Sequence, residues 1–181
     1  MQHEPTLRRP YVVAVDGPSG AGKTCLADQL RAGVDRASVV HLDDFYPGWD
    51  GLDAAVPRLV AWVLQPVSVG RPGRWRRYDW VAGRYAEWHE VAPCDVLVVD
   101  GVGAGARACA PYLDALLWVE AAEPERYRRA MARDGVGYRP YWRRWAAAEQ
   151  VHHAREGTRE RADVRLLLPG RGIRPDRGSP P

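Results

Sequence analysis

The stretch VVAVDGPSGAGKTCLADQL, residues 12–30, joins a run of β-branched residues to a segment of helical composition through a glycine-rich turn. Residues 11–15 predict a short buried strand, and residues 25–31 predict the helix that follows it. The turn between them, GPSGAGKT, fits the pattern GxxxxGK(S/T). A strand before this pattern and a helix after it are the context in which such a turn wraps around phosphate groups.

Lys23 is the only lysine among the 26 basic residues of the chain. Glycines in such a turn let successive backbone N–H groups and the helix N-terminus point at an anion. A lysine reaches the terminal phosphates as a compact mobile charge, whereas the planar fork of an arginine is larger and fixed. The hydroxyl of Thr24 suits a magnesium ion. The predicted nucleotide-binding residues are Gly17, Pro18, Ser19, Gly20, Ala21, Gly22, Lys23 and Thr24.

The composition fits one globular domain over residues 1–170. The chain has 181 residues, 46% hydrophobic and 27% charged, which is enough for one core and too few for two ordinary domains. Its formal charge of +3 comes from scattered arginines rather than one basic block, and this suits small anionic ligands. Residues 171–181 are rich in Pro, Gly and Arg, and we expect a disordered tail there.

Cysteine spacing and hydrophobicity exclude several classes of protein. Cys25, Cys94 and Cys109 show no CxxC spacing, so neither a disulfide framework nor a zinc site is indicated. No apolar run approaches the ~20 residues of a membrane span, and the first apolar run is too short for a secretory leader. We therefore expect a cytoplasmic protein with no membrane partner.

The remaining elements alternate between strand and helix. Residues 37–42, 96–99, 115–119 and 164–168 predict four further strands, and residues 123–133 and 141–155 predict helices. This alternation predicts a three-layer α/β fold of the P-loop NTPase type with a five-stranded parallel sheet. Residues 70–91 interrupt it and predict a small β-rich insertion, either a hairpin or an irregular segment.

Acidic residues follow two of these strands. Asp43 and Asp44 come after the second strand, and Asp100 ends an apolar run in the manner of a Walker B acid. Because the carboxyl ends of parallel strands share one edge, these acids should lie near the phosphate loop. We expect Thr24 and Asp100 to hold the metal. The alternative is that these acids only cap helices or occupy solvated turns.

Arginines line one face of the helix predicted over residues 123–133. Arg126, Arg129 and Arg133 follow i, i+3, i+7 spacing, where like charges repel unless an anion lies opposite. Arg129 and Arg133 could therefore stabilise a transferring phosphoryl group. Residues 134–145 contain two glycines and a proline and predict a mobile, arginine-bearing lid. The alternative is a solvated face whose arginines pair with neighbouring acids.

Aromatic and histidine side chains carry weaker signals. Trp142 and Trp145 predict the buried stripe of a helix, and the adjacent His152 and His153 are expected on the surface of that helix. The tryptophans of residues 70–91 should pack the insertion and wall a substrate pocket, although stacking on single-stranded nucleic acid is an alternative. Nucleic acid is not expected as a partner, because no continuous basic stripe is present.

The motifs GPSGAGKT, DDFY, YDW, VVDG and RRAMARD together resemble those of the uridine kinase group of P-loop kinases, to which phosphoribulokinase and pantothenate kinase are similar. The resemblance covers nearly all of residues 11–168. It implies ATP and Mg²⁺ as cofactors, and a small molecule with a hydroxyl group as phosphoryl acceptor. It also implies that Asp43 is the general base and helps Thr24 and Asp100 to hold the metal, with Lys23, Arg129 and Arg133 as the other catalytic residues.

Two departures from the family pattern concern the metal and the substrate. Asp100 stands where the family usually has a longer glutamate, and Gly83 stands where uridine kinases have the histidine that reads the pyrimidine. We therefore expect the phosphoryl transfer that the resemblance implies, but we do not expect uridine as the acceptor. The candidate substrate contacts are Tyr46, Tyr78, Asp79, Arg84 and Arg139.

The sequence thus predicts a small-molecule kinase that phosphorylates an alcohol group, with two alternatives. The first is a cytidylate-like kinase of nucleoside monophosphates, for which Arg71, Arg74, Arg76 and Arg77 could line a monophosphate pocket. The second is a P-loop ATPase or switch that needs no acceptor.

Overall fold

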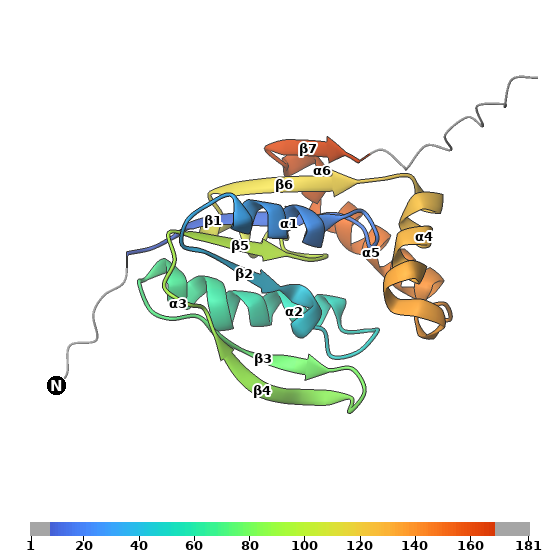
Figure 1. Ribbon diagram of the computed structural model, residues 1–181, viewed down its shortest axis with the longest axis horizontal. Coiled ribbons are helices and arrows are strands. Elements are labelled where there is room, and N and C mark those ends of the chain that lie inside the picture. Colours follow the sequence, from blue (N-terminus) through green and yellow to red (C-terminus); the bar gives the residue numbers. More distant parts are fainter. Residues whose placement is uncertain (1–7, 169–181) are drawn as a thin grey trace, which may run out of the picture.

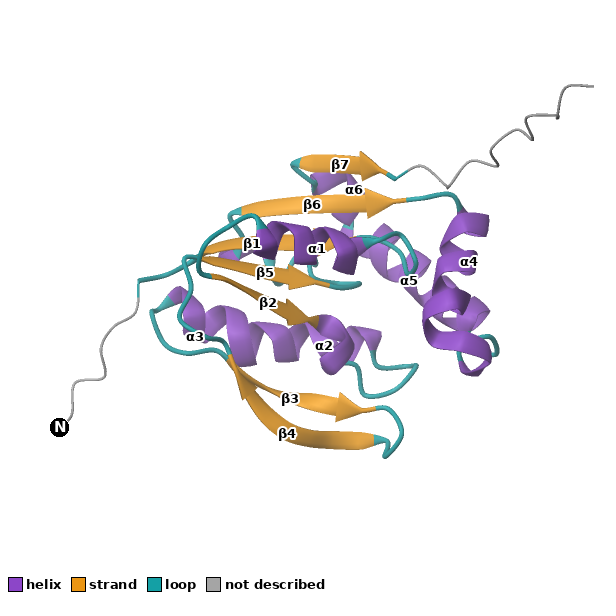
Figure 2. Ribbon diagram, in the orientation of Figure 1, coloured by secondary structure: helices purple, strands orange, loops and turns teal. Residues whose placement is uncertain are grey.

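A five-stranded parallel sheet forms the centre of the computed structural model, which describes residues 8–168 (Figures 1 and 2). The strand order is β2-β5-β1-β6-β7. The tail predicted for residues 171–181 lies outside the described residues. The strands are β1 (Tyr11–Asp16), β2 (Ala37–His41), β5 (Val96–Asp100), β6 (Ala115–Glu120) and β7 (Val164–Leu167).

Both faces of the sheet are buried, which is why its strands read as continuous apolar runs. Successive side chains of β1 point to opposite faces, so Val13 and Val15 belong to one hydrophobic cluster and Val12 and Ala14 to the other. α1 (Lys23–Ala32) covers the first face and packs on β1, β2 and β5. The predicted three-layer α/β fold with five parallel strands is confirmed.

Three helices follow β6, and the first of them lies beyond the carboxyl edge of the sheet while the last lies alongside β6 (Figure 1). They are α4 (Glu123–Asp134), α5 (Trp142–Glu156) and α6 (Thr158–Arg161), with the short 3₁₀ turn Gly135–Gly137 between α4 and α5. The segment predicted as a lid therefore connects two helices beside the expected site. Within residues 8–168, no helix is both long enough and apolar enough to span a membrane.

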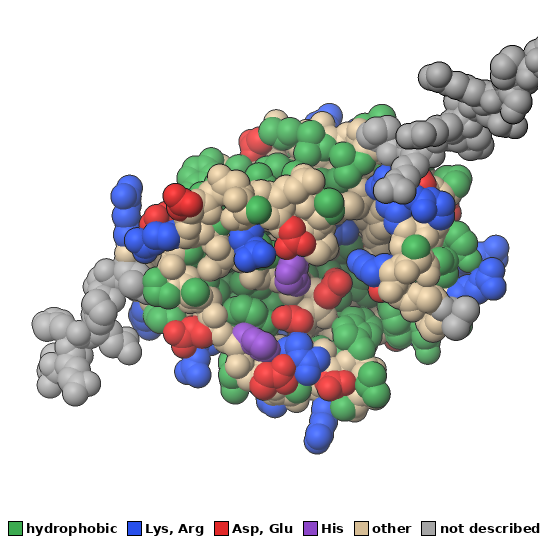
Figure 3. All heavy atoms as spheres, viewed as in Figure 1, with side chains coloured by type: hydrophobic (Ala, Val, Ile, Leu, Met, Phe, Trp, Pro, Cys, Tyr) green, Lys and Arg blue, Asp and Glu red, His purple; other side chains and the backbone are tan. Residues whose placement is uncertain are grey.

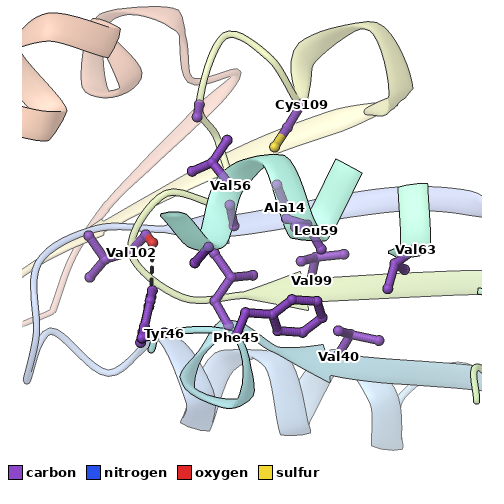
Figure 4. Packing of buried hydrophobic residues seen from close by; sticks show 14 of the residues in the cluster. Ala14, Val40, Phe45, Tyr46, Val56, Leu59, Val63, Val99, Val102 and Cys109 are labelled. Carbon is purple, nitrogen blue, oxygen red and sulfur yellow. Dashed lines mark hydrogen bonds between the residues drawn. The ribbon is translucent and has the colours of Figure 1, made fainter. Parts of the chain in front are cut away.

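A helical segment that the sequence patterns do not predict covers the second face. It runs through α2 (Leu52–Leu59), a π-helical turn (Val60–Leu64) and α3 (Gln65–Ser68). Pro57 and Pro66 interrupt its sequence, and Pro57 lacks the N–H that an interior helical residue donates. Its buried residues nevertheless recur at helical spacing, at Leu52, Ala55, Val56, Leu59, Val63 and Val67, so they form one buried face. Figure 4 shows its side chains packed against the sheet.

The predicted insertion is a β-hairpin, formed by β3 (Arg74–Asp79) and β4 (Arg84–Glu90) in a separate antiparallel sheet. Trp75 is buried and stacks at 6.3 Å between ring centroids on Phe45 of the segment after β2. Trp80 and Trp88 are more exposed, but their rings lie 4.7 Å from Trp49 and 6.0 Å from Trp62. All three tryptophans thus pack the hairpin onto the domain, as expected.

Leu59→Ala should lower the free energy of unfolding by about 2–5 kcal/mol, because Leu59 is fully buried between α2 and the sheet. Urea unfolding would measure the change, with Val81→Ala as a control, since Val81 is 100% exposed in the hairpin turn. A loss below about 0.5 kcal/mol for Leu59→Ala would show that this helix is not part of the core.

Candidate functional site

The predicted functional segments meet at the carboxyl edge of the sheet. The loop of residues 17–24 follows β1, the 3₁₀ turn η1 (Leu42–Asp44) follows β2, and Asp100 ends β5. Ligands of open α/β sheets bind beyond this edge. Figure 3 shows acidic, basic and histidine side chains gathered in the middle of the face bordered by α1 and the hairpin.

Two glycines explain how the loop of residues 17–24 fits its place. Gly17 has φ +141°, and a Cβ there would lie 2.0 Å from the carbonyl oxygen of Val119 in β6. Gly20 has φ +76°, and a Cβ there would lie 2.2 Å from the carbonyl oxygen of Arg126 in α4. The loop is therefore pressed against β6 and α4, and only glycine allows both the backbone conformation and the close approach.

The N-terminus of α1 faces this loop. Its N-cap is Gly22, and no side chain of the described residues 8–168 caps it. The first N–H groups of a helix have no partner within the helix, and its dipole favours an anion there. The Nζ of Lys23 donates to the carbonyl of Pro18 at 3.2 Å, within the same loop. The loop thus has the donors that a phosphate group needs.

Asp100 is held by two neighbours at the end of β5. It is only 3% exposed, and its Oδ2 accepts a hydrogen bond of 2.8 Å from the hydroxyl of Thr24. Its Oδ1 contacts Nδ1 of His41, the residue opposite it in β2. The hydrogen bond to Asp100 raises the pKa of His41. Sequence reasoning missed His41, whose only signal was its place at the end of a strand.

The Thr24–Asp100 pair fits a magnesium ion. Mg²⁺ prefers oxygen ligands, and proteins usually hold it with one or two carboxylates together with substrate phosphates and water. Among residues 8–168, no group of three or more His, Cys, Asp or Glu side chains is arranged to hold a metal alone. A hydroxyl and a buried carboxylate next to a loop with donors for a phosphate group would therefore suit Mg²⁺ bound together with phosphates. The role of Asp43 in holding the metal stays a prediction.

The two adjacent acids of η1 have different surroundings. Asp44 accepts a hydrogen bond of 2.8 Å from the indole of Trp75, which joins η1 to the hairpin. The side chain of Asp43 is exposed, but protein atoms packed around it displace part of its hydration. This desolvation raises the pKa of Asp43. The positive charges of Arg133 and Lys23 act in the opposite direction. Asp43 is thus the acid left accessible beside the phosphate loop.

The arginines of α4 face the phosphate loop, as their spacing predicts. Arg126 donates to the carbonyl of Ser19 at 3.2 Å, and Arg129 donates to the carbonyl of Ala21 at 3.2 Å. Arg133 is more exposed and pairs with its neighbour Asp134 at 2.7 Å. A cavity of about 190 Å³ lies between loop and helix, lined by Gly20, Gly22, Lys23, Thr24, Cys25, Arg129, Ala130 and Arg133.

Asp16, which the sequence patterns did not single out, fixes the start of the phosphate loop. Its side chain is fully buried and accepts N–H bonds from Gly17 at 2.6 Å, Gly103 at 3.1 Å and Gly105 at 2.9 Å. Its Oδ1 also lies 3.1 Å from Nε2 of His153. Burial alone would raise the pKa of Asp16, but the hydrogen bond and charge of His153 and these N–H groups lower it.

The expected surface position of His152 and His153 is therefore wrong. His152 is 2% exposed and contacts Asp53 of α2 at 3.1 Å, while His153 reaches Asp16. α5 packs between α2 and the loops at the carboxyl edge, so polar side chains on its inner face find buried partners. The predicted burial of Trp142 and Trp145 on the same helix is confirmed.

Four aromatic side chains join three separate segments in front of the site, and we call them the aromatic clasp. Trp49, from the loop after η1, stacks on Tyr138 at 5.0 Å and on Tyr141 at 4.6 Å between ring centroids. It also contacts Trp80 of the hairpin turn at 4.7 Å. The indole of Trp80 donates to the carbonyl of Asp43 at 3.2 Å. The clasp thus ties the lid segment and the hairpin to the segment that carries Asp43.

The candidate substrate contacts lie in different surroundings. Tyr46 is buried and donates to the carbonyl of Val102 at 2.9 Å (Figure 4), and Asp79 accepts N–H bonds within the hairpin turn. Arg139 is exposed and donates to the hydroxyl of Tyr127. Tyr78 packs on Trp80 of the clasp at 5.6 Å, and Arg84 is exposed on the hairpin. As substrate contacts, all five stay predictions.

Comparison with solved structures finds kinases that share this fold. A possible uridine kinase from Bacillus stearothermophilus is 21% identical with a TM-score of 0.64, covering 88% of this chain and 89% of that chain. A putative fructose transport system kinase from Silicibacter sp. TM1040 is 18% identical with a TM-score of 0.58, covering 90% and 92%. A D-glycerate 3-kinase from Cryptococcus neoformans is 14% identical with a TM-score of 0.55, covering 93% and 89%.

Neither models of protein families nor curated protein sequences match this chain. At such low identities the structural likeness establishes the fold, which is that of the P-loop kinases over most of the chain. The resemblance inferred from the sequence motifs is confirmed at that level.

Asp16→Asn should lower the free energy of unfolding at pH 7 by at least about 2 kcal/mol, because its amide group would face N–H donors in the interior. The folded pKa of Asp16 lies below the ordinary value of 3.8, so its ionisation stabilises the fold above that pH. The contribution is lost as the pH falls below 3.8 and through the folded pKa. The difference between wild type and variant should therefore shrink toward pH 3.

Denaturant unfolding at several pH values would measure this difference, with the exposed Asp28→Asn as the matched control. A difference that stays constant between pH 7 and pH 3 would contradict the assigned ionisation of Asp16.

Proposed function

We propose that the protein is an ATP- and Mg²⁺-dependent kinase that transfers the γ-phosphoryl group to a hydroxyl group of a small molecule. One observation carries the proposal: the Thr24–Asp100 pair, the phosphate loop and the accessible carboxylate of Asp43 lie at one edge of the sheet. A metal-side acid, a phosphate cradle and a base in one place are the parts that phosphoryl transfer requires.

The phosphate loop would bind the nucleotide through its backbone N–H groups and the N-terminus of α1. Lys23 would exchange its bond to the carbonyl of Pro18 for the β- and γ-phosphates. Arg129 and Arg133 line the same cavity and would stabilise the charge on the transferring group. Thr24 and Asp100 would hold Mg²⁺, which, when bound, would neutralise negative charge on the phosphates.

Asp43 would act as the general base. Its carboxylate would accept the proton of the acceptor hydroxyl as the oxygen bonds to the γ-phosphorus, while the bond to the β–γ bridging oxygen breaks and ADP leaves. The desolvation that raises the pKa of Asp43 also makes its carboxylate a better proton acceptor. A positioned base of this kind typically contributes about 10²- to 10⁴-fold in rate.

The acceptor would lie between Asp43 and the aromatic clasp. Trp49, Trp80 and Tyr138 offer apolar walls and could exclude water, which would otherwise compete as acceptor. Exclusion of water in this way would favour a kinase over an ATPase or switch without an acceptor.

The nucleoside monophosphate alternative has less support. Arg76 donates to carbonyls of its own hairpin, Arg77 pairs with Glu87 at 2.6 Å, and Arg74 pairs with Glu90 at 3.4 Å. Arg71 lines a cavity with Pro10, which precedes β1 at the opposite edge of the sheet. These arginines do not converge beside the phosphate loop, as a monophosphate pocket would require.

ADP release with Mg-ATP should rise when the right acceptor is added from a panel of nucleosides, nucleoside monophosphates, pantothenate and sugar phosphates. Asp43→Asn should lower kcat by about 10²- to 10⁴-fold and leave nucleotide binding largely intact, because the base is lost and the phosphate loop is not. Lys23→Ala should weaken nucleotide binding as well as turnover, since it removes a charge from the phosphates.

Asp35→Asn serves as the control, because Asp35 is exposed in the turn before β2. If ATP is hydrolysed without stimulation by any acceptor, and Asp43→Asn changes nothing, the protein is a hydrolase or switch rather than a kinase.

A further inference from the structure

α5 presents three side chains to the phosphate loop at helical spacing. Trp145, Glu149 and His153 follow one another at i, i+4 and i+8 on its inner face. The first two contact Ser19, and the third contacts Asp16. The catalytic roles proposed above use none of these three residues.

Both polar groups of the Ser19 backbone are held, each by a different helix. Its N–H donates to Oε1 of Glu149 on α5 at 2.8 Å, and its carbonyl accepts from Arg126 on α4 at 3.2 Å. Oε2 of Glu149 lies 3.9 Å from the same guanidinium of Arg126. The two helices that flank the lid segment, α4 and α5, therefore both form hydrogen bonds with the same residue of the phosphate loop.

Glu149 is an unusual residue to bury beside a loop that binds an anion. It is 2% exposed, and a buried carboxylate is costly unless its partners compensate the lost hydration. Its partners here are the Ser19 N–H, the indole N–H of Trp145 at 2.6 Å and the nearby Arg126. The carboxylate accepts both N–H groups at a single oxygen, so it fixes their relative positions.

Trp145 connects this contact to the acceptor side. Its indole N–H also lies 2.9 Å from Oγ of Ser19, and its ring packs edge-on against Tyr46 at 4.9 Å between centroids. It contacts Trp49 of the aromatic clasp at 6.1 Å. Tyr46 belongs to the same short segment as Asp43. One side chain thus touches the phosphate loop and the segment that carries the proposed base.

We propose that Glu149 and Trp145 are positioning residues, which hold Ser19 and thereby set the phosphate loop relative to the segment of Asp43. They act through the loop and do not touch the reacting atoms. The inference rests on the proposed function, because aligning the phosphate loop with Asp43 matters only if the loop binds ATP and Asp43 acts as the base. Its first consequence, that these side chains tune nucleotide affinity, can be measured without an acceptor.

Calorimetric titration of each full-length variant with Mg-ADP tests this consequence. Glu149→Ala leaves the Ser19 N–H without its acceptor and the Trp145 indole with Ser19 Oγ alone, and it should raise the Kd by about tenfold, equivalent to the loss of one hydrogen bond to a charged group. Glu149→Gln keeps an oxygen acceptor and should restore the Kd to within about threefold of wild type. Trp145→Phe keeps the ring contacts but loses the donor to Ser19, and it should give an intermediate Kd.

Gln150→Ala, a change at an exposed position of the same helix, should leave the Kd unchanged. Thermal unfolding of each variant separates positioning from a structural role. If Glu149→Ala lowers the melting temperature but leaves the Kd of the folded protein unchanged, the inference is overturned. If Glu149→Ala does not fold, the Kd values of Glu149→Gln and Trp145→Phe decide the same question.

The outcomes also separate this inference from the proposed function. If the variants weaken Mg-ADP binding but no acceptor stimulates turnover, the positioning role stands and the kinase proposal fails. If the wild type binds Mg-ADP and the variants bind it equally well, the positioning role fails alone. A wild type that does not bind Mg-ADP would overturn both.

Discussion

The buried carboxylate of Asp16 is the interaction on which the geometry of this edge depends. It ends β1, and it accepts N–H groups from the phosphate loop at Gly17 and from the loop after β5 at Gly103 and Gly105. A buried N–H group without a partner is costly, so each of these loops is held where Asp16 can reach it. His153 completes the set from α5, with its Nε2 3.1 Å from Oδ1 of Asp16.

Beyond Asp16, the candidate site depends on contacts between the phosphate loop and the elements around it rather than on any single element. Gly17 and Gly20 allow the phosphate loop to lie against β6 and α4, and Arg126 and Arg129 of α4 then bind its carbonyls. Glu149 of α5 accepts the N–H of Ser19, with its Oε2 3.9 Å from the same Arg126. A loop held by two helices keeps its N–H groups aimed at one place, which is how a preorganised site would stabilise phosphate charge.

The parts of the fold that could be predicted are those whose signals are local. The apolar runs gave the five strands to within about one residue at most ends, because a strand buried on both faces needs apolar residues throughout. The helical segment from Leu52 to Ser68 was missed although its buried residues recur at helical spacing, because Pro57 and Pro66 look like helix breakers. His152 and His153 looked like surface residues because the sequence around a polar side chain does not show whether the folded protein places a polar partner, such as Asp16, beside it.

The sequence by itself determined the order of strands and helices, the phosphate loop with its single lysine, and the acids that follow the strands. Those features depend on residues close together in the chain, where periodicity, glycine conformation and turn chemistry act directly. Only the tertiary structure decided that Asp44 is held by Trp75 while Asp43 stays accessible, and that Trp49 stacks on the lid segment. It alone placed α5 against the phosphate loop, because such contacts join residues more than a hundred positions apart, and no local pattern records them.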